Sequence, residues 1–405
     1  MKILHVVHTH PSLGSTGGTE LYVQAIAAAR GDPVFTRDHG AELRKQGRLW
    51  IAGVPPARDF RESWSAPSVA AALARVVDDE KPDGLHVHHL AHLDLSPPTS
   101  PYLLTLHDYH LACARGQLVN RESELCEGPS PERCASCVVS QLRAPRSLLG
   151  LGQLVHAMGM TELARKALSA SPPTARMIDE VASRNAGGRS VLDGARRILS
   201  PSAALARRFE GMGLARDIHV QDLPLLTPIT SRPRQPGPVR FLFVGSLIPT
   251  KGPMLLLRAF ARIGEGELQI WGPRVPYFGE SRYADTVVRM AERTPRTRYC
   301  GVFESEQRQE VYAGGDVLVV PSTWPENSPL VVREAVAAGL RVIATDHGGV
   351  GEIDPGARLV PAGDVGALTT AMAEHLDEPS RRGARDFPMD RHLHQLARHY
   401  EACFG

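Results

Sequence analysis

The chain has 405 residues, of which 46 are basic and 44 acidic, so its formal net charge is +2. This length allows two domains with substantial cores, and the charge balance does not favour a dedicated nucleic-acid-binding protein. No apolar stretch approaches the length of a membrane span, and six cysteines in a long chain without a signal sequence indicate a reducing compartment. We therefore expect a cytoplasmic protein, whose excess of arginine would allow peripheral contact with the inner face of a membrane.

The N-terminal segment is predicted to be a strand, a glycine-rich loop and a helix. Residues 2–8 form a short apolar run, which is typical of a first β-strand rather than a secretion signal. Gly17 and Gly18 precede a helix over 20–29, so the backbone there could approach a ligand closely and the helix start could bind an anion. The glycines depart from the GxGxxG pattern, which weakens a dinucleotide site, and a flexible surface turn is the alternative.

Short strands and helices then alternate, which predicts a parallel sheet. The expected elements are strands at 34–35, 49–51, 84–89 and 102–106 and a helix at 68–79. His86, His88, His89 and His92 lie at or beyond the end of strand 84–89, where His86 and His88 share one face and His89 does not. We interpret them as polar groups at the ligand-binding edge of the sheet rather than as a metal site.

The strand over 102–106 is followed by His107 and Asp108. A histidine at the carboxyl end of a central strand is expected to project into the cleft of an open α/β fold. The alternative is a structural histidine held by hydrogen bonds.

Four cysteines, Cys113, Cys126, Cys134 and Cys137, follow with twelve, seven and two intervening residues. This spacing is compatible with a four-thiolate structural zinc site. Unliganded or disulfide-forming cysteines remain the alternative. The arginine-containing residues 141–197 are predicted to be helical, with a solvated face as the ordinary interpretation and contact with lipid headgroups as the other.

A domain boundary is predicted in residues 224–238, which contain five prolines. Before it, we expect a strand at 198–200 and a helix at 203–211. The predicted organisation is a domain over 1–228 with a cysteine-rich and helical insertion at about 109–195, a linker over 229–238, a second domain over 239–385, and a C-terminal segment over 386–405 with a helix at 389–404.

The second domain is predicted to begin with a strand at 239–244 and a loop that runs from Gly245 and Ser246 to Lys251. Lys251 precedes a helix over 253–263 and could neutralise a diphosphate. The alternative interpretation is a surface lysine in a turn. Strands are also expected at 268–272, ending in Gly272, at 299–303, which includes Val302, and at 341–344.

In the central segment of this domain, a loop joins a buried strand at 317–320 to a helix that we expect to start near Leu330. Ser328 is predicted as the N-cap and Pro329 as the first helical residue. Glu326 then lies on the loop and Glu334 lies about one turn into the helix, so the two carboxylates should reach different parts of one ligand. The helix N-terminus between them favours an anion.

Glu326, seven intervening residues, Glu334, Ala335 and Ala338-Gly339 resemble the nucleotide-binding signature of the retaining glycosyltransferases of family 4. The resemblance implies the GT-B fold, an α/β architecture with two Rossmann-like, doubly wound parallel-sheet domains facing a cleft. It also implies transfer of a sugar from a nucleotide-diphosphate sugar to a saccharide or lipid-linked saccharide acceptor, in cell-surface polysaccharide or glycoconjugate synthesis. Alternatives are a nucleotide-sugar epimerase of the same build and a non-catalytic sugar-nucleotide-binding protein.

Site roles follow from this resemblance. Glu334 would hold the ribose hydroxyls, Glu326 the donor sugar, and Lys251 with the Leu330 and Val331 amides the diphosphate. The remaining donor-site residues would be Gly17, Gly18, Gly245, Ser246, Gly272, Val302, Asn327 and Ser328. The acceptor side would comprise Glu20, His88, His107 and Asp108.

The resemblance further assigns the catalytic roles to His107, Glu326 and Lys251, with His107 near the transferred sugar but not as a general base. No Asp-x-Asp motif stands where the donor would sit, so we expect catalysis without a divalent cofactor. Ser246 replaces an arginine of the family, which leaves Lys251 as the main expected cation. Similar cysteine-bearing insertions occur in relatives from polysaccharide gene clusters, and the C-terminal helix should pack back on the first domain.

Overall fold

The computed structural model describes residues 1–14, 17–40, 42–91, 93–120, 124–139, 172–234, 236–277, 280–377 and 383–405. The chain divides into two compact units, and each is described by itself. The first unit comprises Met1–Ser200, Ala206–Val220 and Gln395–Gly405, and the second comprises Pro201–Leu205 and Gln221–His394. The proline-rich residues 224–238 therefore belong to the second unit.

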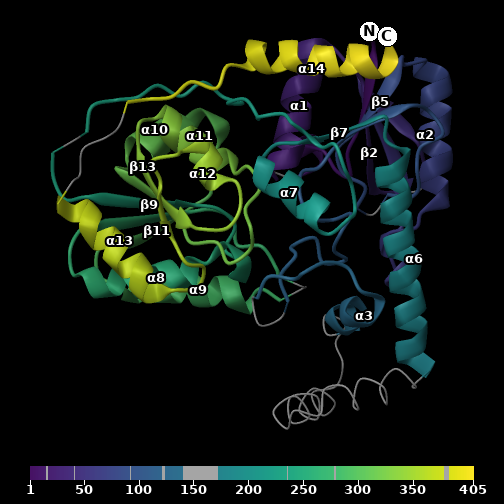
Figure 1. The fold of residues 1–405 in the computed structure, drawn as a ribbon. Helices are drawn as coiled ribbons and strands as arrows, with labels where there is room; N and C mark the ends of the chain where they lie inside the picture. Colours follow the sequence, from purple (N-terminus) through teal and green to yellow (C-terminus); the bar gives the residue numbers. More distant parts are fainter. Residues whose placement is uncertain are drawn as a thin grey trace. The chain divides into compact units, whose positions relative to one another are not determined.

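The first unit contains an eight-stranded sheet with the order β3-β4-β2-β1-β5-β6-β7-β8 (Figure 1). Its strands are β1 (Ile3–Val6), β2 (Val34–His39), β3 (Arg44–Gln46), β4 (Leu49–Val54), β5 (Gly84–Val87), β6 (Tyr102–Thr105), β7 (Arg197–Ser200) and β8 (His219–Val220). All neighbouring strands pair in parallel except β3 and β4, which are antiparallel. The sequence pattern did not indicate this antiparallel edge.

The helices that begin in this unit or contribute to it are α1 (Gly18–Arg30), α2 (Pro67–Glu80), α3 (Pro131–Val139), α6 (Pro172–Gly194), α7 (Ala203–Gly211) and α14 (Met389–Phe404), with short 3-10 turns η1 (Pro11–Leu13) and η2 (Arg61–Ser63). The unit division falls within α7 and within α14. Of the helical segment predicted over 141–197, residues 141–171 lie outside the described residues, as does His92.

The second unit contains a six-stranded, all-parallel sheet with the order β11-β10-β9-β12-β13-β14. Its strands are β9 (Arg240–Val244), β10 (Glu267–Trp271), β11 (Thr297–Gly301), β12 (Val317–Val320), β13 (Arg341–Thr345) and β14 (Arg358–Val360). Its helices are α8 (Pro253–Ile263), α9 (Arg282–Arg293), α10 (Arg308–Ala313), α11 (Leu330–Ala337), α12 (Val350–Ile353) and α13 (Val365–Asp377), with 3-10 turns η3 (Pro249–Lys251) and η4 (Ser305–Gln307).

Alternate residues of β9 face opposite layers of this unit, as the two-residue period of a strand requires. Phe241 and Phe243 pack in one hydrophobic cluster with residues of α8, α9 and α13, whereas Leu242 packs in another with residues of α10, α11 and α12. Figure 1 shows these two groups of helices on opposite faces of the sheet. The sheet is therefore doubly wound, as predicted.

Each sheet has one point at which the strand order reverses. In the first it lies between β1 and β5, and in the second between β9 and β12. The loops that follow two such neighbouring strands leave toward opposite faces, which opens a crevice at the carboxyl ends. The strand order thus marks two places for functional side chains: the loops after β1 and β5, and the loops after β9 and β12.

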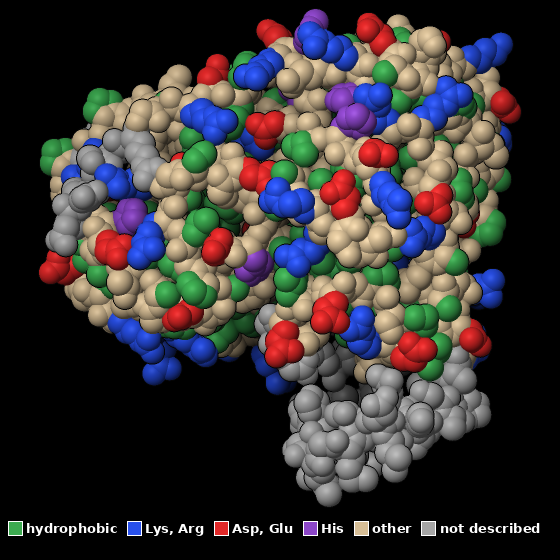
Figure 2. Space-filling view, in the orientation of Figure 1, with side chains coloured by type: hydrophobic (Ala, Val, Ile, Leu, Met, Phe, Trp, Pro, Cys, Tyr) green, Lys and Arg blue, Asp and Glu red, His purple; other side chains and the backbone are tan. Residues whose placement is uncertain are grey.

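On the face drawn in Figure 2, basic and acidic side chains are interspersed. Within the described residues, no helix combines the length and the apolar character needed to cross a membrane.

Candidate active site

The loops after β9 and β12 touch through their backbones. Gly252 has φ +71°, and a Cβ at this position would lie 2.0 Å from the carbonyl oxygen of Pro321. The amide of Thr323 also donates to the carbonyl of Thr250 over 2.8 Å. Only glycine combines this backbone conformation with so close an approach. The contact brings Lys251 and Glu326, which are 75 residues apart, into an ion pair of 2.7 Å.

Glu326 is 4% exposed and its Oε1 atom accepts three hydrogen bonds. The donors are Nζ of Lys251 at 2.7 Å, the hydroxyl of Ser322 at 2.6 Å and Nε1 of Trp324 at 2.9 Å. Lys251 also lies 5.0 Å from the centroid of the Trp324 ring. The structure thus joins Lys251 and Glu326, as their common position at the sheet edge predicts, and adds Ser322 and Trp324, which the sequence reasoning missed.

Glu334 lies one turn into α11 and is also 4% exposed. One carboxylate oxygen accepts from Arg308 and the other from the hydroxyl of Tyr312. Burial raises the pKa of Glu334, while Arg308 and the Tyr312 hydrogen bond oppose that change. The sequence reasoning did not find Arg308 and Tyr312, although their i, i+4 spacing on α10 places them on one helix face.

The N-terminus of α11 differs from the prediction in its cap. The N-cap residue is Pro329, and no side chain caps the helix. The predicted cap, Ser328, instead accepts a hydrogen bond of 2.8 Å from Arg333, which also bonds to Asp222. The prediction of Ser328 as N-cap is therefore wrong, because a buried arginine one turn later takes its hydroxyl. As a result, no side-chain cap competes for the first-turn amides of Leu330 and Val331.

A glycine pair at 348–349 supports the loop that carries Glu326. A Cβ on Gly348 would lie 2.0 Å from the carbonyl oxygen of Glu326, and one on Gly349 would lie 1.9 Å from that of Asn327. The Gly349 amide donates to the Glu326 carbonyl over 2.7 Å, and the Asn327 side chain accepts from Ser202 over 2.6 Å. The loop's shape therefore depends on a turn more than twenty residues later in the chain.

The other predicted donor-site residues lie at the carboxyl ends of neighbouring strands. Gly272 has φ +146°, and a Cβ there would lie 1.9 Å from the carbonyl oxygen of Gly245. Ser246 is half-buried, and Val302 is 61% exposed just beyond β11. Strand pairing places the ends of β9, β10 and β11 side by side, so these residues share one edge.

In the first unit, the start of α1 brings Glu20 to the end of β1. Oε1 of Glu20 lies 3.1 Å from Nε2 of His8, and Glu20 is 5% exposed. A Cβ on Gly17 would lie 2.2 Å from Oε2 of Glu20, so the glycine gives the folded-back carboxylate its space. Gly18 is the first residue of α1. Burial raises the pKa of Glu20.

His88, His107 and Asp108 lie at the neighbouring ends of β5 and β6. Nδ1 of His88 is 3.1 Å from Nε2 of His107, and Asp108 pairs with His89 at 2.8 Å. Burial lowers the pKa of His107 to about 3. Burial alone would raise the pKa of Asp108, but charged His89 and a hydrogen bond from the His110 amide hold it well below its usual range.

A small cavity of about 20 Å³ lies among these residues, and His88, His89, His107 and Asp108 are part of its lining. This volume is sufficient for about one water molecule. The first unit therefore presents imidazoles and one carboxylate at its switch-point edge.

His86 is not at this edge, contrary to the prediction. It lies inside β5 with no exposed surface, and its ring nitrogens bond to the Tyr400 hydroxyl and to Thr105 Oγ1, both at 2.7 Å. The expected alternation is confirmed, because the His86 and His88 rings lie 3.8 Å apart while His89 turns to Asp108. β5 ends at Val87, two residues before the predicted end, but His86 points into the core, where Tyr400 and Thr105 take both of its ring nitrogens.

Two groups of side chains are candidates for metal binding. Among the described residues, His5, His86 and His88 form a set of potential ligands whose atoms lie within 4.8 Å of one another. Hydrogen bonds already occupy both ring nitrogens of His86 and join His5 to His88. Of the ring nitrogens in this set, Nε2 of His5 makes no hydrogen bond within the described chain and faces Asp32 at 3.5 Å.

The second group consists of the four clustered cysteines, none of which forms a disulfide. Cys134 and Cys137 lie on α3, and Cys126 follows the bridge between Val119 and Leu125. Burial and the neighbouring Cys113, Cys126 and Cys137 thiols raise the pKa of Cys134 to about 11. The other three thiols thus act electrostatically on Cys134, but no three of the four sulfur atoms lie within 4.8 Å of one another in the described chain. The chemistry of the donor set suits zinc.

Comparison with known proteins finds similarities to glycosyltransferases in part of the chain. Residues 238–378 match the family model of the glycosyl transferases group 1. The chain is 29% identical to D-inositol 3-phosphate glycosyltransferase 2 of Catenulispora acidiphila over 252 residues, which cover 56% of this chain and 57% of that protein. The match thus spans little more than half of the curated relative.

Two solved structures share the architecture over almost the whole chain. Sucrose-phosphate synthase from Thermosynechococcus elongatus has a TM-score of 0.65 at 17% identity and covers 99% of this chain and 98% of its own. HepE from Anabaena, solved in complex with UDP and glucose, has a TM-score of 0.61 at 17% identity and covers 99% of this chain and 100% of its own. The predicted fold is confirmed: the chain has the GT-B fold, and its residues 238–378 are similar to the glycosyl transferases group 1.

Proposed function

We propose that the protein is a retaining glycosyltransferase that moves a sugar, in the first instance a hexose, from a nucleotide-diphosphate sugar to an acceptor hydroxyl. One observation carries the proposal: the ion pair of Lys251 and Glu326 and the uncapped N-terminus of α11 meet at the strand edge of a domain similar to the glycosyl transferases group 1. A cation and free backbone amides at one place suit a diphosphate.

The donor would be held by three groups with separate tasks. Glu334 would accept hydrogen bonds from the ribose hydroxyls, since a buried carboxylate already fixed by Arg308 and Tyr312 is a rigid acceptor. Lys251 and the amides of Leu330 and Val331 would receive the diphosphate. Glu326, fixed by Ser322 and Trp324, would contact the sugar. The presence of UDP and glucose in the HepE structure supports a donor of this class.

The same groups would stabilise the charge that develops on the leaving diphosphate. Preorganised donors aimed at a developing charge are among the largest contributions to catalysis. We propose that Lys251 and the α11 amides perform this task in a step without a divalent ion.

On the other unit, His107 would lie beside the transferred sugar, with Glu20, His88 and Asp108 on the acceptor side. The proposed acceptor is a saccharide or lipid-linked saccharide of a cell-surface polysaccharide or glycoconjugate. The proposed location is the cytoplasm, with peripheral contact at the inner face of the membrane.

A panel of nucleotide sugars tests this function. The purified protein is incubated with each donor, with and without glycan acceptors, and nucleotide release and product masses are measured. The expected result is acceptor-dependent nucleotide release and a product heavier by one sugar with the anomeric configuration of the donor. An isomerised donor without transfer would instead identify an epimerase, and binding without turnover a non-catalytic protein.

We also propose that Cys113, Cys126, Cys134 and Cys137 hold a structural zinc ion. Its support is the set of four soft sulfur donors, the electrostatic effect of the other three thiols on Cys134, and the hydrogen bond of 3.5 Å from the Ser130 amide to the Cys134 sulfur. Metal analysis of the purified protein should find about one zinc per chain, and a chelator should lower the melting temperature. Protein without zinc or iron, or a melting temperature that chelation leaves unchanged, would refute the site.

A further inference from the structure

A row of polar side chains runs from the interior of the first unit to its switch-point edge. It begins at Asp32, passes through His5 on β1 and His88 after β5, and ends at His107 after β6. These three strands are neighbours in the sheet, and the register pairs His5 with His86, two residues before His88. Side chains two residues apart on a strand share one face, so the histidines line up across adjacent strands.

Each member of the row lies close to the next. Nδ1 of His5 is 3.0 Å from Nε2 of His88, and Nδ1 of His88 is 3.1 Å from Nε2 of His107. Nε2 of His5 lies 3.5 Å from Oδ2 of Asp32, an electrostatic contact rather than a short hydrogen bond. His5 is fully buried, His88 is 3% exposed and Asp32 is 5% exposed, so water does not interrupt the row.

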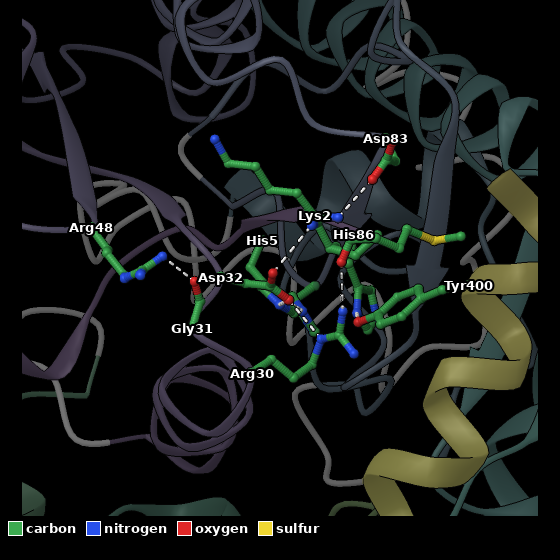
Figure 3. A network of polar contacts seen from close by, with 12 residues as sticks. Lys2, His5, Arg30, Gly31, Asp32, Arg48, Asp83, His86 and Tyr400 are labelled. Carbon is green, nitrogen blue, oxygen red and sulfur yellow. Dashed lines mark hydrogen bonds and ion pairs between the residues drawn. The ribbon is translucent and has the colours of Figure 1, made fainter. Parts of the chain in front are cut away.

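Asp32 gives the row a fixed electrostatic end. Its carboxylate accepts from Nε of Arg30 at 2.6 Å and from the Ile3 amide at 3.3 Å. Figure 3 shows Asp32 held between Arg30 and His5, with His86 and Tyr400 of α14 beside them. Burial would raise the pKa of Asp32, but His5 and Arg30 lower it on balance, so the carboxylate is charged.

The charge of Asp32 decides which nitrogen of each ring carries hydrogen. A lone pair on Nε2 of His5 would face the carboxylate and be repelled, so Nε2 carries the hydrogen and Nδ1 accepts. His88 must then donate from Nε2 and accept at Nδ1. By the same step, His107 donates from Nε2, and its Nδ1 carries the lone pair.

The histidines remain neutral in this arrangement. Burial lowers the pKa of His5, and burial together with the neighbouring imidazoles lowers that of His88 well below its usual value. A protonated ring would lack an acceptor nitrogen and would break the row. His86 stands outside it, since both of its nitrogens bond to Tyr400 and Thr105.

We propose that Asp32, His5 and His88 are positioning residues that fix the ring tautomer and orientation of His107, so that its Nδ1 presents an acceptor to a hydroxyl of the bound sugar. The sugar as ligand rests on the function proposed above, but the tautomer does not. The row would hold the imidazole in the manner of a partner that orients a catalytic histidine through its far nitrogen.

The test reads the tautomer directly. Protein labelled with ¹⁵N-histidine is examined by long-range ¹H–¹⁵N NMR at neutral pH, and the His107 signals are assigned by their loss in His107→Asn. Wild-type His107 is expected as the Nε2–H tautomer. Asp32→Asn keeps the shape but removes the charge, so the Nδ1–H tautomer should appear at His107. His88→Gln, which lacks the Nδ1 acceptor, should have the same effect.

Two variants serve as matched controls. Tyr400→Phe removes a buried hydrogen bond from the same layer without touching the row, and Asp83→Asn changes a carboxylate that bonds only to Lys2 among the described contacts of its side chain. Both should leave the His107 tautomer unchanged. A wild-type Nδ1–H tautomer, or an unchanged tautomer in folded Asp32→Asn and His88→Gln, would overturn the proposal, as would a metal ion bound to these rings.

Kinetics connect the tautomer to turnover. If Asp32→Asn halves the productive tautomer, kcat/KM for the donor should fall about twofold from population alone. Both controls should keep the wild-type value. If the protein transfers no sugar at all, the glycosyltransferase proposal fails while the NMR result still decides the positioning one.

Discussion

The two units place different chemistry at the same topological position. In the second unit, charged side chains are paired: Lys251 with Glu326 between the two switch-point loops, and Arg308 of α10 with Glu334 of α11. At the switch point of the first unit, the neutral imidazoles of His88 and His5 connect the edge of the sheet to the interior. The comparison shows that strand order fixes where a site lies, whereas the side chains decide whether it offers charge or oriented dipoles.

The largest effect should come from breaking the charged pair. Lys251→Ala should lower turnover on the order of a hundredfold, as does removal of one preorganised electrostatic group, and turnover should fall more than nucleotide affinity does. Steady-state kinetics with a saturating donor measure the first quantity and calorimetry the second.

The chain offers a matched control for this variant. Lys45 also pairs with a glutamate, Glu80, at 2.6 Å, and lies 4.4 Å from the centroid of the Trp50 ring, but at the β3 edge of the first unit. Lys45→Ala should keep wild-type turnover. Near-normal turnover in Lys251→Ala would show that another cation neutralises the diphosphate.

A second prediction concerns nucleotide binding, rather than turnover, in the second unit. Glu334→Ala should weaken nucleoside diphosphate binding by about 1.5–3 kcal/mol, the range for hydrogen bonds to charged groups. Isothermal titration calorimetry provides the measurement. Glu310→Ala is the control, since Glu310 lies on α10 with a 68% exposed side chain and pairs only with Arg232 among the described ion pairs. Equal affinities of wild type and Glu334→Ala would remove the ribose assignment.

Lowering the pH should destabilise the first unit, whose buried histidines are neutral. The pKa of His107 is lowered from 6.5 to about 3, so the unfolded chain binds more protons than the folded one between these values. The free energy of unfolding should therefore fall as pH drops below 6.5, by up to about 1.4 kcal/mol per pH unit for each such histidine. Hydrogen exchange across the first unit measures this slope.

Variants sharpen the acid prediction. His107→Asn should flatten the slope, whereas substitution of His39, whose side chain is exposed, should not. His88 and His110, whose pKa values are also lowered by burial, would add contributions of the same sign. Stability that stays constant from neutral pH to pH 4 would contradict a neutral imidazole core.

The smallest expected effect is a partial recovery of turnover. Ser246 lies on the loop after β9, at the position where the resemblance to family 4 implies an arginine. Ser246→Arg introduced into Lys251→Ala should recover part of the lost turnover if this position faces the diphosphate. The same steady-state assay measures it, with Ser246→Gln as the uncharged control of similar length. No recovery with arginine would place Ser246 away from the phosphates.

The sequence predicted the framework of the fold well because its buried strands and amphipathic helices are strongly patterned. The bounds of β12, α7, α8 and α14 agree with the predicted residues, and Lys251 and Glu326 meet as common edge residues. Helix α9 was missed although its apolar residues follow the helical period.

The remaining features depend on contacts between distant segments. Ser328 follows the pattern of a helix cap, but Arg333 claims its hydroxyl, which no local rule reveals. The row from Asp32 to His107 requires three strands to pair, and their order in the sheet cannot be predicted from the residues of any one of them. His86 was misplaced because its ring is held in the core by Tyr400 and Thr105, which lie far from it in the sequence.

The glycine turn at 348–349 has a consequence for how this site could be altered. Because its missing side chains make room for the Glu326 and Asn327 carbonyls, any larger residue there must push the loop that carries both side chains. Alanine at either position would therefore act on donor recognition without changing a residue that touches the donor. A mutational screen of the second unit should then find that both glycine positions are sensitive, although neither has a side chain that could contact the donor. Substitutions at this turn would therefore change the position of Glu326 indirectly.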